Sequence, residues 1–240
     1  MNENFLIYCI VIFGAGLLGG ILPFIRKWSD ELLHLFISFG AGIFIGTVFL
    51  HLLPEALSHD HAEKSALFVL IGFMLIFFIE RFLVVKGDGS YDHSHYVVSI
   101  TALVGLSVHS IIEGLGLAVG QEYQDIGSLI FFSIIAHKST AAFSLASLFL
   151  LAKINAKKRF LLIILFSAMT PIGAILFSSL FTTIDHEMLS PFLGLTAGTF
   201  LYVAVGELLP EVFHTKSHKW AKMFLLILGI IIMSLIKHGH

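Results

Sequence analysis

Eight apolar segments follow one another along this chain, and they limit what it can fold into. They cover residues 5–25, 32–57, 65–85, 97–120, 126–152, 160–183, 188–212 and 220–237, and short connections join them. Each has about the 20 residues that an α-helix needs to cross a bilayer core roughly 30 Å thick. Backbone groups in hydrocarbon must be satisfied internally, which favours helices. The sequence therefore predicts an all-α membrane protein with eight transmembrane helices, in one polytopic domain over residues 1–240.

The amino-acid composition is also typical of a protein that lies in a lipid bilayer. The chain is 57% hydrophobic and 12% charged, whereas a soluble domain is about a quarter charged. The formal net charge of −2 gives no basis for nucleic-acid binding. Cys9 is the single cysteine, which excludes a disulfide framework or a CxxC metal site within the chain. The first segment follows no basic region and is long enough to cross by itself, so we expect a true span rather than a cleaved leader.

Basic residues mark one side of the membrane. They gather after segments 1, 3, 5 and 7, as Arg26, Lys27, Arg81, Lys86, Lys153, Lys157, Lys158, Arg159, Lys216, Lys219 and Lys222. The opposite side has only Lys64 and Lys237, and Lys138 falls in the middle of segment 5. Because Lys and Arg are enriched in cytoplasmic loops, we expect a multi-pass cell-membrane protein with both termini extracytoplasmic.

Segments 2 and 7 repeat one another. AGIFIGTVFLHLLPEAL begins at Ala41 and AGTFLYVAVGELLPEVF begins at Ala197, an offset of 156 residues, with the LLPE stretch in register. The two segments would cross in opposite directions. We therefore expect an inverted repeat, segments 1–3 and 6–8 around segments 4–5, although helices of similar composition could also match by coincidence. Inverted repeats are typical of transporters that bind substrate near the midplane.

Two central segments carry residues able to bind a metal. His109 and Glu113 in segment 4 are four residues apart and share one helix face. Segment 5 places His137 and Lys138 at a similar depth. Each charge at the bilayer centre costs roughly 2.5–3.5 kcal/mol on insertion scales, which favours a functional role. Imidazole and carboxylate suit Zn²⁺. We predict a divalent-metal site of His109, Glu113 and His137; the structural alternative is an ion pair between Glu113 and Lys138, with the histidines as hydrogen-bond partners.

Further metal-capable residues lie towards the two membrane faces, where a cation path needs acceptors. The predicted path contains His51 and Glu55 towards the outside, Ser110 and Lys138 beside the central site, and Glu80, Glu207, Glu211 and His214 towards the inside. Residues in or near loops could serve the same path or simply be solvated. They are His34, His59, Asp60, His61, Glu63, Asp92, His93, His95, Asp185, His186, Glu187 and His218.

These motifs resemble those of the ZIP (Zrt-, Irt-like) metal transporters along the whole chain. The resemblance rests on HSIIEGLGLAVG, HKSTAAFSLA, MTPIGA and AGTFLYVAVGELLPE, and is greatest to the animal plasma-membrane zinc importers. It implies an importer that brings Zn²⁺, and also Cd²⁺, Fe²⁺ or Mn²⁺, across the lipid bilayer into the cytoplasm as transported substrate. It also implies that helices 1, 4, 5 and 6 move against helices 2, 3, 7 and 8, commonly within a homodimer.

The chain departs from the two-metal pattern of many family members. Ser110 stands where that pattern often has Asn, Lys138 where it has an acid, Ala141 where it has Glu or His, and Thr170 where it has Glu. His109, Glu113 and His137 match the first metal site, whereas the second is expected to be absent. A lysine charge about 7 Å from a divalent ion opposes binding by up to roughly 5 kcal/mol at an effective dielectric near 20, so we expect weak binding and fast release.

Other functions fit the sequence less well. An intramembrane zinc-dependent hydrolase could use the same three residues, but the chain has no HExxH motif. A proton-coupled exporter of the cation-diffusion type resembles a six-helix bundle with a cytosolic domain. A purely structural bundle leaves the central histidines unexplained. Because the sequence also shows no separate general base pair, we expect no enzymatic activity, and because it has no P-loop, we expect no use of ATP.

Overall fold

The computed structural model describes residues 3–58, 62–84, 91–119, 124–180, 186–215 and 217–238. Nearly all of these residues are helical, and no strand occurs among them. The elements are α1 (Glu3–Ile25), α2 (Asp30–Thr47), η1 (Val48–Leu52), α3 (Leu53–Leu57), α4 (Ala62–Phe78), η2 (Ile79–Val84), α5 (Tyr91–Val119), α6 (Gln124–Leu151), α7 (Ala156–Leu180), α8 (His186–Leu201), η3 (Tyr202–Leu208), α9 (Leu209–Phe213) and α10 (Lys219–His238).

The prediction of an all-α membrane protein is confirmed. Six helices in the described ranges are long and apolar enough to cross a membrane: Asn4–Ile25, Asp30–Leu57, Ala62–Phe82, His95–Ala118, Ala156–Ser179 and Pro191–Phe213. α6 and α10 correspond to the remaining two predicted segments. Large apolar side chains cover the outer surface, as Leu18 and Ile25 on α1 and Phe224 on α10 illustrate with 66–74% exposure. Such a surface is suited to lipid rather than to water.

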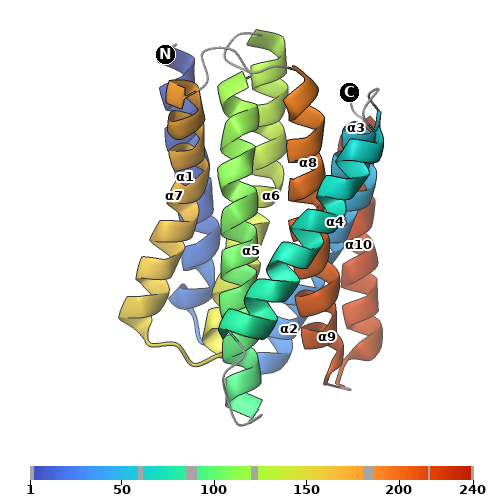
Figure 1. Ribbon diagram of the computed structural model, residues 1–240. Helices are drawn as coiled ribbons and strands as arrows, with labels where there is room; N and C mark the ends of the chain where they lie inside the picture. Colours follow the sequence, from blue (N-terminus) through green and yellow to red (C-terminus); the bar gives the residue numbers. More distant parts are fainter. Residues whose placement is uncertain are drawn as a thin grey trace.

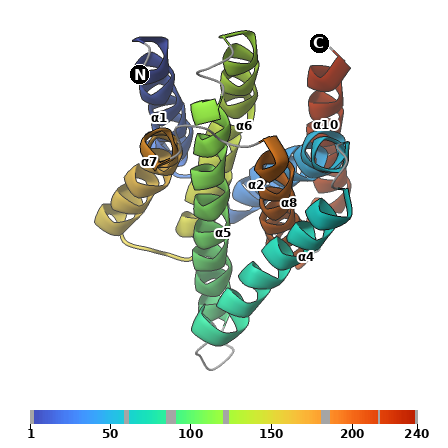
Figure 2. The ribbon, with the colours of Figure 1, turned by 45° about the horizontal axis from the view of Figure 1, so that its top comes forward.

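The helices pack in two groups. α1 contacts α6 and α7, and α5 contacts α7, which makes one group of α1, α5, α6 and α7. α2 contacts α10, and α4 contacts α8, which makes the other, with α3 and α9 as continuations of α2 and α8. Figure 2 shows the first group on the left and in the centre, and the second group on the right. The groups meet where α2 packs on α6 and where α8 packs on α5.

α5 and α7 cross at two glycines that leave no space for a side chain. A Cβ on Gly114 would lie 2.3 Å from the backbone nitrogen of Ala174, and one on Gly173 would lie 2.2 Å from the carbonyl oxygen of Ile111. Helices in a bilayer associate through such close backbone contact, because lipid removes most of the hydrophobic drive between them. This crossing brings Thr170 of α7 beside Glu113 of α5.

We expect Gly114→Ala to lower the thermal stability of the purified protein, because the methyl group meets backbone rather than a flexible side chain. Overpacking of this kind costs typically 1–3 kcal/mol. Melting in detergent measures the effect. Gly14→Ala is the matched control, since no atom outside its own helix surroundings lies within 4 Å of a Cβ there. Equal melting temperatures for the two variants would show that α5 and α7 do not cross this closely.

The repeated segments share an unusual backbone feature. η1 and η3 are wide π turns that end at Leu52 and Leu208. α3 follows η1, α9 follows η3, and these two short helices have the same length. The ends of the two turns are separated by the 156-residue offset of the sequence repeat. In each turn a leucine N–H donates to the carbonyl oxygen five residues earlier, Leu53 to Val48 and Leu209 to Ala204.

The prolines of the two LLPE stretches explain the wide turns. Pro54 and Pro210 have no N–H, and their rings would clash with the carbonyl four residues earlier, so the helix opens just before them. Figure 1 shows α3 at the top of the bundle and α9 at the bottom, so the two copies run in opposite directions. We call the two ends of the bundle the α3 end and the α9 end. The antiparallel arrangement agrees with the predicted inverted repeat.

Candidate metal site

Glu113 is the centre of the predicted cluster. His109 Nε2 lies 2.9 Å from Glu113 Oε1, and His137 Nε2 donates a hydrogen bond to the same oxygen. One ligand atom from each residue lies within 4.8 Å of the others, and the two histidines are almost fully buried. The four-residue spacing places His109 and Glu113 on one face of α5, and the packing of α6 on α5 brings in His137. The structure therefore brings the three predicted residues together.

The other oxygen of Glu113 faces a polar relay. Thr170 donates a hydrogen bond to Glu113 Oε2 at 3.1 Å. Lys138 Nζ donates to Thr170 at 2.9 Å and to Ser110 at 2.6 Å, and it lies 4.2 Å from the centre of the Phe166 ring. The lysine thus reaches the carboxylate through the Thr170 hydroxyl. Among the described residues no direct ion pair joins Glu113 to Lys138, unlike in the structural alternative considered above.

Phe200 of α8 closes the cluster on the side of the second helix group. Its ring centre lies 3.6 Å from that of His109 and 6.2 Å from that of His137. Phe200 is fully buried and also packs against Phe44, at 4.9 Å between ring centres. Phe200 was not among the residues predicted from the sequence. The signal was available, because Phe44 and Phe200 are equivalent positions of the internal repeat.

The donor set suits a borderline divalent ion that must leave again. Two imidazole nitrogens and one carboxylate make three ligands, and Zn²⁺ sites with three protein ligands keep a fourth position open. The Nδ1 atoms of His109 and His137 have no hydrogen-bond partner among the described residues. Metal-binding histidines usually donate this second N–H to a carboxylate or a carbonyl, which raises affinity. No described residue accepts such a bond from His109 or His137, which favours weak binding.

The predicted path residues occupy both ends of the bundle. Ser110 and Lys138 adjoin the cluster, as predicted. Towards the α3 end, His51 Nε2 donates to the carbonyl oxygen of Met233 in α10 at 3.0 Å, and Glu55 is exposed. Towards the α9 end, Glu80 accepts a hydrogen bond from Tyr202, and Glu207 is buried.

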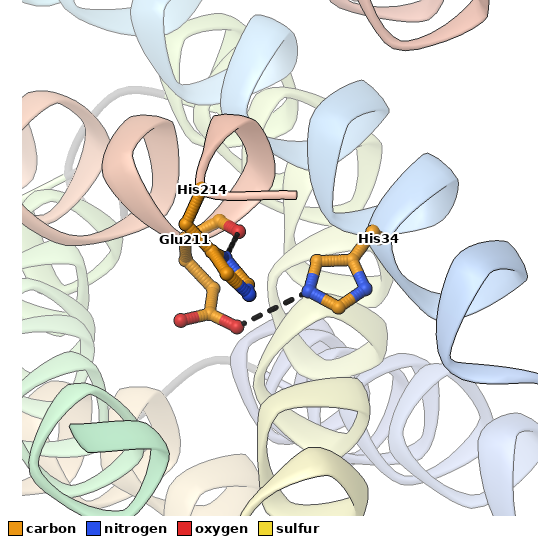
Figure 3. Close-up of side chains that lie close together, drawn as sticks. All are labelled: His34, Glu211 and His214. Carbon is orange, nitrogen blue, oxygen red and sulfur yellow. Dashed lines mark hydrogen bonds and ion pairs between the residues drawn. The ribbon is translucent and has the colours of Figure 1, made fainter. Parts of the chain in front are cut away.

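Glu211 and His214 belong to a second cluster at the α9 end. His34 Nε2 lies 3.4 Å from Glu211 Oε1, and His95 Nδ1 lies 2.8 Å from the same oxygen. Figure 3 shows His34, Glu211 and His214 converging. The sequence placed these residues at one end of the bundle but did not predict that they meet.

Two of the remaining predicted loop residues have described side chains, Glu63 and His218. His218 forms an exposed pair with Glu31 at 3.4 Å, as expected of a solvated residue, and Glu63 lies in the first turn of α4. His59, Asp60, His61 and Asp185 lie outside the described residues, and so do the side chains of Asp92, His93, His186 and Glu187.

Comparison with known proteins identifies relatives along the whole chain. The family model for ZIP zinc transporters matches residues 4–90 and 85–237. Protein zntD of Dictyostelium discoideum is 36% identical over 150 residues, which are 60% of this chain and 22% of that protein. Zinc transporter ZIP9 of Xenopus tropicalis is 26% identical over 282 residues, covering 92% of each chain. Zinc transporter ZIP1 of Homo sapiens is 26% identical over 253 residues, covering 85% of this chain and 78% of that protein.

Proposed function

Because the chain belongs to the ZIP zinc transporter family, and so is a transporter of divalent metal rather than an enzyme, we propose that Zn²⁺ passes through the cluster of His109, Glu113 and His137. The observation that supports this most is the convergence of both imidazoles on one buried carboxylate oxygen. The cluster holds a single carboxylate, so a bound Zn²⁺ is incompletely neutralised and has an open position. Both properties favour release. The hydrolase alternative has no support from the relatives.

The place of the cluster between the two helix groups suits a carrier. Its three ligands come from α5 and α6 of the first group, whereas Phe200, which covers the His109 ring, comes from the second. A displacement of one group against the other would move the ligands relative to this aromatic cover. We propose that such a displacement exposes the cluster to one membrane face and then to the other. The two LLPE stretches run in opposite directions, so the two ends of the bundle are built alike. Each end can then be the open one in one of the two states of the carrier.

We further propose one metal per central cluster. Lys138 holds a positive charge beside the carboxylate, tethered by Ser110 and Thr170. A second divalent ion would need oxygen ligands where this ammonium lies. Cd²⁺, Fe²⁺ and Mn²⁺ remain candidate substrates beside Zn²⁺, and competition with radioactive zinc in proteoliposomes ranks them.

The positions of the basic residues support one orientation in the membrane. Arg26 and Lys27 lie between α1 and α2, Lys158 and Arg159 lie at the start of α7, and all of them are at the α9 end. We therefore propose that this end faces the cytoplasm, that both termini are extracytoplasmic, and that metal moves inwards across the cell membrane. A homodimer, as implied by the family resemblance, is part of the same proposal.

Purified protein in sealed liposomes should take up zinc without ATP. The zinc gradient supplies the driving force, and the sequence has no P-loop with which to use a nucleotide. Radioactive zinc uptake is measured with and without ATP inside the vesicles, and empty liposomes give the background. Saturable uptake of equal rate in both samples is the expected result. A strict requirement for ATP would contradict the proposal.

A further inference from the structure

We propose that His34, His95, Glu211 and His214 form a second divalent-cation site at the α9 end, separate from the central cluster and tighter than it. The inference rests on the proposed function for the class of cation, but its test does not depend on transport. His109 and His95 are both on α5, 14 residues apart, so the two sites are separated by roughly 21 Å along a helix that rises 1.5 Å per residue.

Three histidines surround the carboxylate of Glu211 at this end. Besides the distances to Glu211 Oε1 given above, the ring centres of His34 and His214 lie 5.1 Å apart, and those of His95 and His214 lie 5.6 Å apart. His34, His95 and Glu211 are each at most 5% exposed, whereas His214 is exposed. Ligand atoms of His34, Glu211 and His214 all lie within 4.8 Å of one another. The site is therefore built inside the protein and opens to the surface beside His214.

Backbone carbonyls fix the tautomers of two of these histidines. His34 Nδ1 lies 2.5 Å from the carbonyl oxygen of Asp30, and His214 Nδ1 lies 2.5 Å from that of Glu211. A carbonyl oxygen only accepts, so in each ring Nδ1 carries the proton and donates. In the neutral imidazole Nε2 then has the lone pair that binds metals. Carbonyls in this position orient metal-binding histidines in the same way.

Among the described residues no lysine or arginine forms an ion pair with Glu211, and the buried ammonium of Lys222 donates instead to neighbouring carbonyl and hydroxyl oxygens. His34 Nε2 and Glu211 Oε1 approach to 3.4 Å without the geometry of a hydrogen bond, and neither atom has a hydrogen-bond partner among the described residues. His95 Nδ1 lies 2.8 Å from the same oxygen and can donate to it, but His34 Nε2 and Glu211 Oε1 remain two buried acceptors that face each other, an arrangement that a cation or a proton between them would relieve. Figure 3 shows the imidazole of His34 directed at the carboxylate, with His214 beside it.

Ligand number distinguishes this site from the central one. His34, Glu211 and His214 already offer three ligand atoms within 4.8 Å of one another, and His95, whose Nδ1 lies 2.8 Å from Glu211 Oε1, can add a fourth. Four ligands would complete a tetrahedral shell for Zn²⁺, whereas the central cluster supplies three. The ligands also come from both helix groups, because His95 is on α5 while His34 is on α2 and Glu211 is on α9. A cation bound here would join the two groups. Zinc should therefore stabilise the folded bundle through this site.

The test counts zinc bound to the full-length protein in detergent. We expect two Zn²⁺ per chain in the parent protein, one in His109→Ala, one in the double variant His34→Ala and His214→Ala, and none when all three are combined. X-ray absorption at the zinc edge of the His109→Ala variant should show a shell of three imidazoles and one oxygen. Its melting temperature should still rise with zinc, whereas that of the His34→Ala and His214→Ala variant should rise much less.

Two further variants separate binding from folding. His218→Ala is the matched control, because this histidine lies at the same end but is exposed and paired with Glu31, and it should keep both metals. Glu211→Gln keeps the shape of the carboxylate while removing its charge, so it tests the site if the alanine variants fail to fold, and it should lose one metal.

The outcomes separate the second site from the central one. One Zn²⁺ in the parent chain that His109→Ala removes, or two that survive both the double variant and Glu211→Gln, would overturn the second site and indicate that a proton occupies the cluster. Two Zn²⁺ that survive His109→Ala would instead contradict the central site while leaving the second one standing.

Discussion

Replacing Glu113 by glutamine should reduce saturable zinc uptake to nearly the level of empty liposomes, although the protein still inserts and folds. Glutamine keeps the shape of the side chain and an oxygen that can accept from His137 and Thr170. What it removes is the only negative charge of the central cluster, and the ammonium of Lys138 then dominates the local field. Losing even about 3 kcal/mol of attraction for a divalent ion lowers affinity by roughly 100-fold.

His109→Ala should have an equally large effect, because it removes one of three ligands and leaves a cavity beneath Phe200. Uptake of radioactive zinc into proteoliposomes measures both variants, at protein amounts matched by quantification after reconstitution. Glu31→Gln is the matched control for the charge change, since Glu31 is exposed at the α9 end and is not part of the proposed path. Normal saturable uptake by Glu113→Gln would remove the carboxylate from the transport site.

The spacing of residues along single helices was sufficient to predict the centre of the site. His109 and Glu113 share a face because four residues make about one helical turn, and similar depth in neighbouring segments suggested His137 as their partner. The role of Thr170 could not be predicted in this way. It depends on how closely α5 and α7 approach at Gly114 and Gly173, which is a property of two helices together.

The sequence repeat predicted the direction of two segments but not the shape of their backbone. It predicted two antiparallel segments, and the structure shows in addition that both contain a wide π turn before the proline. The second cluster was beyond sequence reasoning for a different reason. His34, His95 and His214 belong to three segments far apart in the chain, and topology assigns them only to a common end of the bundle. Which of several histidines there converge on Glu211 depends on the rotation of each helix about its own axis.

Lys138→Asp should create an additional metal position beside the central one. In the parent protein the ammonium lies between the hydroxyls of Ser110 and Thr170, and Thr170 also bonds Glu113 Oε2. Aspartate would replace a positive charge by a negative one and would add oxygen ligands. A lysine charge about 7 Å from a divalent ion opposes binding by up to roughly 5 kcal/mol, so removing even a third of this effect raises affinity more than tenfold.

The new position should be incomplete, and transport should not improve. Ser110 and Glu113 Oε2 can contribute oxygens beside the new carboxylate, but Ala141 offers no ligand and Thr170 only a hydroxyl. A metal held more tightly also leaves more slowly. Calorimetry should find one more bound Zn²⁺ than in the parent chain, and anomalous scattering should place it within about 4 Å of the first ion, the spacing typical of two-metal sites.

Lys138→Met provides the comparison, because it removes the charge without supplying a ligand. This variant should bind zinc more tightly at the central site but with an unchanged number of ions. If Lys138→Asp left both the number of metals and the affinity unchanged, the charge of Lys138 would have no influence on the metal. The hydrogen bonds of Lys138 to Ser110 and Thr170 would then serve only to hold α6 against α5 and α7.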